Sequence, residues 1–248
     1  MKKSFIIAAL ALAGLANANA QTSTNQTYNG NGNTSFGGAV GNGSLQISNN
    51  GAGALDFTFT RGGGNFNNAL VIYFDSISGG DASTANYTDT ADGLRRAISG
   101  FDVALGRSTL NFGDGFGADY AIALNNGFAG LWSLSNPANF AFQKSANLSP
   151  TGETQTAYTF SINVADIGLT ANSGESFSFF DTYISETAFR SVETMGASYQ
   201  NSPAAGWNTF DAADVNSFTT VPEPSTVALL ALSALGVAGY AVRRRARK

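Results

Sequence analysis

The sequence of 248 residues contains no cysteine and no histidine. The absence of cysteine excludes disulfides and thiol nucleophiles, and the absence of histidine excludes imidazole metal ligands and serine–histidine–aspartate triads. Charged side chains are also scarce, at 12% of the chain. Acid–base chemistry and metal binding are therefore left to aspartate and glutamate, and the fold has to be held by its hydrophobic core.

The few charges are unevenly distributed along the chain. Seven of the 13 cations lie at the two ends, at Lys2, at Lys3 and within the last six residues. Residues 21–220 contain six cations and 16 carboxylates, which gives this part a net charge of −10. Nucleic-acid binding needs a basic face that neutralises phosphates, so the acidic body excludes nucleic acid as a partner.

The N-terminus has the three parts of a secretory signal. Two lysines precede an apolar stretch from Phe5 to Ala16, and the small residues Ala18 and Ala20 then stand before Gln21. This order predicts a signal peptide at residues 1–20 that signal peptidase removes, and hence an exported protein. An N-terminal anchor helix is the alternative, but the apolar stretch is short for a bilayer, which needs about 20 residues.

The C-terminal residues 221–248 also have three parts. The first is Pro222, Glu223 and Pro224, which hold the chain extended before a helix. The second is an uncharged run of 17 residues, 226–242, which as a helix spans roughly 26 Å and is predicted to cross the inner membrane. The third is a basic tail, 243–248, that holds its end in the cytoplasm and places the body on the opposite side. Its cations are Arg243, Arg244, Arg245, Arg247 and Lys248.

This tripartite tail resembles the PEP-CTERM sorting signal. The resemblance rests on Val-Pro-Glu-Pro-Ser-Thr, the short apolar helix and the terminal Arg-Arg-Arg-Ala-Arg-Lys, about a tenth of the chain. It implies recognition by an exosortase, a membrane-embedded transpeptidase or protease of bacteria that make extracellular polysaccharide. The membrane helix is then a transient anchor, and the protein ends at the cell surface or outside the cell.

The body between the two signals divides into an arm and a domain. Residues 21–44 are rich in Asn, Gly, Thr and Ser and are predicted to bury little, as a loose arm or an irregular edge strand. Residues 45–220 are predicted to form a single β-domain. One hairpin is expected across 45–59, and a second across 120–134 with Asn126-Gly127 at its turn. Residues 70–74 are apolar throughout, which indicates a central strand buried on both faces.

Nine or ten short strands separated by Gly and Asn turns predict an all-β protein, an antiparallel β-sandwich of jelly-roll type. A short helical turn is expected near Leu94–Ile98 and another near Ala165–Leu169. The body also resembles DOMON-like sandwiches, which include some carbohydrate-binding modules. That resemblance rests on Gly117–Tyr120, on Ala165–Leu169 and on the aromatic strand after it, and it concerns the fold alone.

Candidate binding residues are aromatic or acidic. Sugar binding needs exposed aromatic faces beside hydrogen-bonding groups, and the candidates are Trp207, Trp132 and Tyr183, with core packing as the alternative for each. Asp114 and Asp119 in glycine-rich turns are candidate calcium ligands, although solvated turn residues explain them as well and no cofactor is required. A glycosidase needs two facing carboxylates, which the sequence alone does not bring together.

The sequence therefore favours an exported, non-enzymatic protein of the cell surface or extracellular matrix. Its expected partners are signal peptidase, an exosortase and the inner membrane. A carbohydrate-binding module for a surface polysaccharide is the alternative, and a polysaccharide-degrading enzyme is the third hypothesis.

Overall fold

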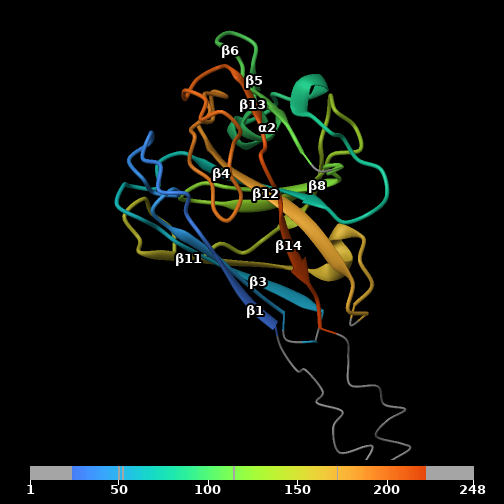
Figure 1. The fold of residues 1–248 in the computed structure, drawn as a ribbon. Coiled ribbons are helices and arrows are strands. Elements are labelled where there is room, and N and C mark those ends of the chain that lie inside the picture. The colour runs from blue at the N-terminus through green and yellow to red at the C-terminus, as the bar shows by residue number, and fades with distance from the viewer. Residues whose placement is uncertain (1–23, 50, 52, 114, 172, 222–248) are drawn as a thin grey trace, which may run out of the picture.

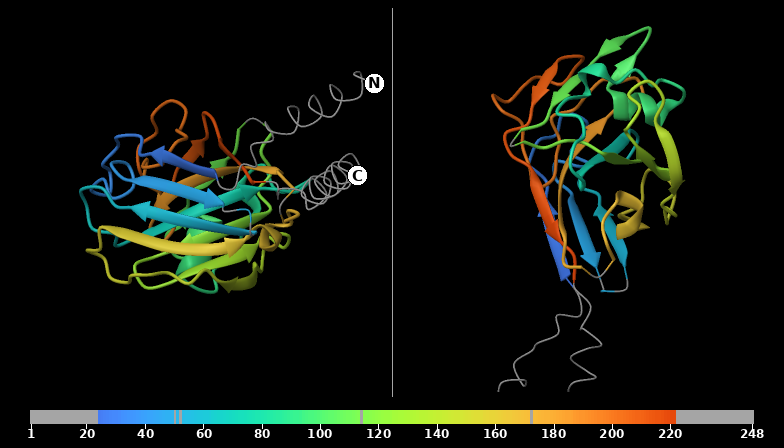
Figure 2. Two further views of the ribbon diagram at one scale, coloured as in Figure 1. Left: turned by 90° about the horizontal axis from the view of Figure 1, so that it is seen from below. Right: turned by 90° about the vertical axis from the view of Figure 1, so that its right-hand side faces the viewer.

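The computed structural model describes residues 24–49, 51, 53–113, 115–171 and 173–221. Two antiparallel sheets dominate this part of the chain (Figure 1). The smaller sheet has the order β1 (Thr24–Asn29), β2 (Ser44–Asn49), β3 (Ala54–Thr60) and β11 (Ala157–Asn163). The larger sheet has the order β10 (Ala141–Ser145), β9 (Ala129–Ser133), β8 (Tyr120–Leu124), β4 (Ala69–Asp75), β12 (Ser176–Ile184) and β14 (Asn216–Thr219). The strands of the smaller sheet lie side by side in the left view of Figure 2.

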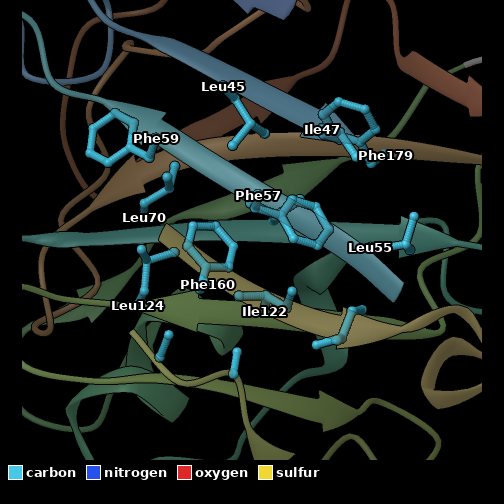
Figure 3. Close-up of a cluster of buried hydrophobic side chains, with 14 of the residues drawn as sticks. Leu45, Ile47, Leu55, Phe57, Phe59, Leu70, Ile122, Leu124, Phe160 and Phe179 are labelled. Carbon is cyan, nitrogen blue, oxygen red and sulfur yellow. The ribbon is translucent and has the colours of Figure 1, made fainter. Parts of the chain in front are cut away.

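The two sheets pack face to face over one hydrophobic core. Alternate residues of β2, β3 and β11 point inward, because successive side chains of a strand lie on opposite faces. They meet the inward side chains of β4, β8 and β12, and Figure 3 shows Phe57, Phe160 and Phe179 in this layer. The Phe57 and Phe160 rings are stacked with centroids 5.0 Å apart. The expected all-β fold with two hairpins is confirmed.

The outer face of the larger sheet is covered as well. The covering elements are η1 (Thr84–Asn86), α2 (Gly93–Ser99), β7 (Thr109–Asn111) and β13 (Thr209–Asp211). Strands β5 (Phe101–Asp102) and β6 (Gly106–Arg107) form a small hairpin after α2, and η2 (Val164–Ile167) comes after β11. The covering elements enclose a second apolar cluster that includes Val71 and Tyr73 of β4, while Leu70 and Ile72 face the first. The Tyr73 hydroxyl donates to the carbonyl of Ile98 in α2 at 2.6 Å. Strand β4 is therefore buried on both faces, as its apolar run predicts.

The expectation of purely antiparallel strands is wrong for one pair. Strand β13 lies parallel to β7, with Phe210 opposite Leu110. Parallel neighbours need a crossover connection, and here it consists of residues 112–208, which include β8 to β12 and end in the irregular residues 185–208. The described residues form 14 strands, more than the nine or ten expected, because β1 and β13 are regular strands and residues 101–111 divide into three short ones.

The N-terminal arm is part of the body from Thr24 onward. Strand β1 is the edge strand of the smaller sheet, and its Tyr28 ring packs against Phe179 at 4.8 Å. The loop after β1 folds back so that Ala39 and Val40 are fully buried. The prediction that this stretch buries little is therefore wrong for these residues, because the body supplies the contacts that their own sequence lacks.

A buried glutamate fixes this loop. Glu193 is fully enclosed, and each of its carboxylate oxygens accepts two backbone N–H groups. Phe36 and Gly38 donate to Oε1 at 2.6 and 3.1 Å, and Val40 and Gly41 donate to Oε2 at 3.1 Å each. Four amide donors replace the water that the carboxylate loses on burial, so the loop and the charge stabilise each other.

A buried arginine lies on the opposite side of the larger sheet. Arg190 is fully enclosed, and its guanidinium donates to Thr182 Oγ1 at 3.0 Å and to the Ser108 carbonyl at 3.4 Å. Within the described ranges, no carboxylate forms an ion pair with it. Gly100, with φ of +60°, ends α2 beside it, and a Cβ there would come within 3.0 Å of the guanidinium. The cation is therefore held by neutral hydrogen-bond acceptors.

Asp181 is a third buried charge-bearing group. Its two oxygens lie 3.1 and 2.9 Å from the Met195 backbone N–H, and the side chain has no solvent exposure. Burial raises the pKa of Asp181 well above its ordinary value, and the Met195 N–H opposes this only in part. Because the folded state then binds the proton more tightly than the unfolded state, stability falls as the pH rises through the folded pKa.

We therefore expect Asp181→Asn to become progressively more stable than the wild type as the pH rises above about 4, the ordinary pKa of aspartate. The amide has no proton to lose, so it escapes the destabilisation that ionisation causes. The check is urea unfolding of both full chains in a non-ionic detergent from pH 4 to 8. Parallel pH profiles for the two proteins would contradict the assignment.

Candidate functional site

A cleft opens at one end of the larger sheet, between α2, the β8–β9 turn and the edge strand β10. It has a volume of about 340 Å³. Its walls come from three places far apart in sequence: residues 92–95, residues 125–142 and Glu186 after β12. The volume lies at the lower end of the range for small-molecule sites, about 300 to 1,000 Å³.

Three aromatic rings form one wall of the cleft. Phe128 and Phe142 are 39% and 48% exposed, and their ring centroids lie 6.3 Å apart with a 34° tilt. Trp132 fills the space beneath them, edge-on to Phe142 at 5.5 Å. All three rings converge over Gly130, where a Cβ would lie within 2.7 to 3.0 Å of each. The glycine therefore leaves the space in which the rings meet.

Strand β10 is irregular where it carries this wall. Its pairing with β9 shifts register between Phe142 and Lys144, which marks a bulge. Phe142 is 48% exposed on this edge strand, whereas Phe140, which lies just before the strand, is buried.

The opposite wall is polar. Asn125 Oδ1 accepts the backbone N–H groups of Gly127 and Phe128 at 3.0 Å each, which directs Nδ2 toward Glu186. That amide donates to Glu186 Oε1 at 2.7 Å, while Oε2 lies where a Cβ on Gly93 would be. The absence of a side chain at Gly93 thus makes room for the carboxylate in the cleft.

Arg95 lies between the aromatic and polar walls. Its Nε is 3.2 Å from Asp89, its Nη1 contacts Asp92, and its Cζ lies 5.7 Å from the Trp132 ring centroid. Asp92 also caps α2 by accepting the Arg95 N–H at 2.8 Å. The guanidinium is therefore already neutralised, and the cleft lining carries two carboxylates and one cation.

The three aromatic residues that the sequence singles out have different environments in the structure. Trp207 is 40% exposed, and its Nε1 donates to the Thr187 carbonyl at 3.0 Å. Trp132 lines the cleft but is only 2% exposed. Tyr183 is fully buried, its hydroxyl accepts from the Asn67 and Asn68 amides, and burial raises its pKa to about 12. Tyr183 as a sugar-stacking residue is therefore wrong, because its ring belongs to the core between the sheets.

Of the two candidate calcium ligands, the structure describes only Asp119. Asp119 Oδ2 accepts the backbone N–H groups of Ser76 and Ile77 at 3.0 Å each. Asp119 also borders a second cleft, of about 380 Å³, whose lining includes Asp81 and Ser133. Asp114 lies outside the described residues, and within the described part of the chain no three acidic side chains gather as a metal site. Asp119 is thus engaged in holding the loop after β4.

The end of the described chain is tied firmly to the body. Thr220 donates through its N–H and its hydroxyl to the Glu175 carbonyl, both at 2.9 Å. Val221 donates its N–H to Asn49 Oδ1 at 2.8 Å and is 1% exposed. The first and last strands also meet here, where Thr24 Oγ1 donates to the Thr219 carbonyl at 3.3 Å. The body is therefore folded up to Val221, the residue before Pro222.

The C-terminal segment of the chain matches a known family. Residues 220–245 match the family described as the PEP-CTERM protein-sorting motif. The C-terminal segment is a PEP-CTERM sorting motif. It marks a protein that an exosortase sorts to the cell surface. No curated protein and no solved structure matches the chain, so the resemblance of the body to DOMON-like sandwiches stays a prediction.

Most of the PEP-CTERM motif lies beyond the described residues. The sorting residues Pro222 to Pro224, the predicted span 226–242 and the basic tail 243–248 all lie outside the described residues. The predicted signal-peptidase site at Ala18, Ala20 and Gln21, at the other end of the chain, also lies outside them. Across residues 24–221, apart from the few gaps, no helix is both long and apolar enough to cross a membrane. The anchor and the signal peptide therefore stay predictions.

The PEP-CTERM motif begins on residues that belong to the folded body. Thr220 and Val221 are the first two residues of the match, and both are buried and hydrogen-bonded. A cleavage anywhere after Val221 leaves every described strand intact. The body and its sorting signal are therefore joined without an intervening linker.

The cleft is only partly visible in the sequence. The sequence singles out Trp132 as a candidate, but it does not point to Phe128, Phe142, Asn125 or Glu186 for this role. Asn125 and Glu186 are 61 residues apart, and no local pattern relates them. The one signal that could have helped is Phe142, an aromatic residue before Gln143 and Lys144, which is typical of an exposed edge strand.

Proposed function

We propose that this chain is a non-enzymatic protein of the cell surface or extracellular matrix, exported by its signal peptide and sorted by an exosortase. The inner membrane holds it transiently through the helix 226–242, with the body on the outer side. The body is a β-sandwich of jelly-roll type that acts by being displayed rather than by catalysis.

The observation that carries this proposal is the direct junction between body and motif. Strand β14 leads through Thr220 and Val221 into Pro222, so the body stands immediately next to the sorting signal. A protein built this way is delivered as a complete folded unit wherever the motif is processed.

The use of the buried acidic side chains supports a non-catalytic role. Glu193, a glutamate that a glycoside hydrolase could have used, is saturated by four backbone amides. Asp181 is enclosed in the core. Glu186 faces a cleft in which Asp92 is occupied by Arg95. A glycoside hydrolase needs two free carboxyl groups that face each other across the glycosidic bond, one as acid and one as base or nucleophile.

The mass of the mature protein from an exosortase-containing host tests this proposal. The full chain has a mass of 25.6 kDa, and we expect the mature form to begin at Gln21 and to lack residues from the tail. The control is the same gene in a host without an exosortase, where only the N-terminal loss should occur. Recovery of the unprocessed 25.6 kDa chain from the first host would overturn the proposal.

A further inference from the structure

We propose that the cleft between α2, the β8–β9 turn and β10 binds a neutral pyranose unit of a carbohydrate. Phe128 and Phe142 would stack on the sugar, and Glu186 would accept its hydroxyl groups. The inference goes beyond the proposed function and rests on the body alone, so it stands or falls independently of the tail.

The aromatic wall defines one face of the ligand. Two phenyl rings that stay 39% and 48% exposed at 6.3 Å separation offer a nearly continuous apolar surface. Phe142 lies on the edge strand β10 and Phe128 in the turn before β9, and exposed apolar side chains that gather in one patch are typical of a binding site. The Trp132 ring packs edge-on against Phe142 and supports it from below. The ligand therefore has at least one flat face of C–H groups.

The polar wall defines the other side. Asn125 is fixed by the turn amides and holds the Glu186 carboxylate 2.7 Å away, while Gly93 leaves room for its second oxygen. A fixed carboxylate accepts hydroxyl hydrogen bonds that are stronger than those to neutral acceptors. A purely apolar ligand would remove water from Glu186 without replacing its hydrogen bonds, which is unfavourable. The ligand therefore donates hydrogen bonds beside its apolar face.

The charge of the cleft excludes anions. Its one cation, Arg95, is paired with Asp89 and Asp92, and Glu186 adds a further negative charge. An acidic sugar or a phosphate would meet two carboxylates and a neutralised guanidinium. A neutral pyranose has a flat C–H face and a rim of hydroxyl donors, and the cleft volume of about 340 Å³ admits a small ring. This is the ligand class that satisfies both walls.

The test is binding of the full chain, in a non-ionic detergent that contains no sugar, to methyl pyranosides of glucose, galactose and mannose and to a glycan array. We expect dissociation constants in about the millimolar range for single rings. Phe142→Ala should weaken binding at least about tenfold, because it removes one of the two rings on which the sugar stacks. Glu186→Gln should weaken binding by about tenfold, because it replaces the charged hydrogen-bond acceptor with a neutral one. Phe142→Trp, which keeps an aromatic ring in the stacking position, should retain binding.

Trp207→Ala is the matched control, because it removes an exposed aromatic ring outside the cleft. It should change the affinity less than about twofold, and thermal unfolding of every variant confirms that the body is folded. Three results would overturn the inference: no binding to any neutral pyranoside or array glycan, binding that survives both cleft substitutions, or tighter binding of glucuronate than of the neutral sugars. Loss of binding in Trp207→Ala alone would move the site to the surface around Trp207 and equally refute the cleft.

Discussion

Replacing Glu193 with glutamine is expected to lower the free energy of unfolding by about 3 kcal/mol or more. The amide is isosteric with the carboxylate but is neutral and keeps only one oxygen, so all four backbone N–H groups lose a charged acceptor and two of them face another donor. A hydrogen bond to a charged group is worth about 1.5 to 3 kcal/mol, and a buried donor without a partner costs a similar amount. That loss is a large fraction of the about 5 to 15 kcal/mol of a typical domain.

Urea unfolding of the full chain in detergent measures this effect, and Glu153→Gln is its matched control. Glu153 is exposed, so its substitution should change stability by less than about 0.5 kcal/mol. Hydrogen exchange provides a local readout, because the amides of Phe36, Gly38, Val40 and Gly41 should lose protection in Glu193→Gln. Equal stabilities of the two variants would show that the carboxylate does not organise the loop.

Sequence pattern predicts the parts of the fold that depend on neighbouring residues. The two hairpins, the doubly buried β4 and the short helix α2 each arise from alternation, from an apolar run or from a turn dipeptide within a few residues. These signals are local because each strand or turn is specified by the side chains that it exposes and buries.

The buried charges could not be predicted in this way. Residues 185–208 have no periodicity, yet they contain Arg190 and Glu193, both fully enclosed. The amides that bind Glu193 lie 152 to 157 residues earlier in the chain. Nothing in the local sequence distinguishes such a glutamate from one on the surface.

The candidate cleft also could not be predicted, because its residues are far apart in the sequence. Asn125 and Glu186 come from the ends of two strands of one sheet, β8 and β12, and β4 lies between these strands. Only the strand order brings the two side chains within 2.7 Å of each other. Trp207 stands out in the sequence because tryptophan is rare in this chain, but rarity says nothing about which rings share a cleft.

The structure changes where the sorting tail should be considered to begin. The sequence pattern places the boundary between residues 220 and 221, whereas Val221 is buried and bonded to Asn49. Removing Val221 together with the tail would therefore also remove an N–H donor from Asn49 and an apolar side chain from the body. A deletion that tests sorting alone should begin at Pro222.

Deleting residues 222–248 is expected to abolish delivery to the cell surface. The truncated chain keeps residues 1–20, the predicted signal peptide, and every described strand, so we expect it to be exported and folded but to lack the motif that an exosortase recognises. A second variant with Pro222, Glu223 and Pro224 replaced by alanine keeps the apolar span and the basic tail. It should stay in the inner membrane unprocessed, which separates recognition by the exosortase from simple anchoring.

Sorting by the tail is tested most directly by the distribution of these chains among the inner membrane, the cell surface and the medium of an exosortase-containing host. We expect the intact chain to reach the surface, the chain ending at Val221 to be released without surface attachment, and the alanine variant to accumulate in the inner membrane. An unchanged surface fraction for the chain ending at Val221 would contradict sorting by the tail, because the protein would then reach the surface without the motif.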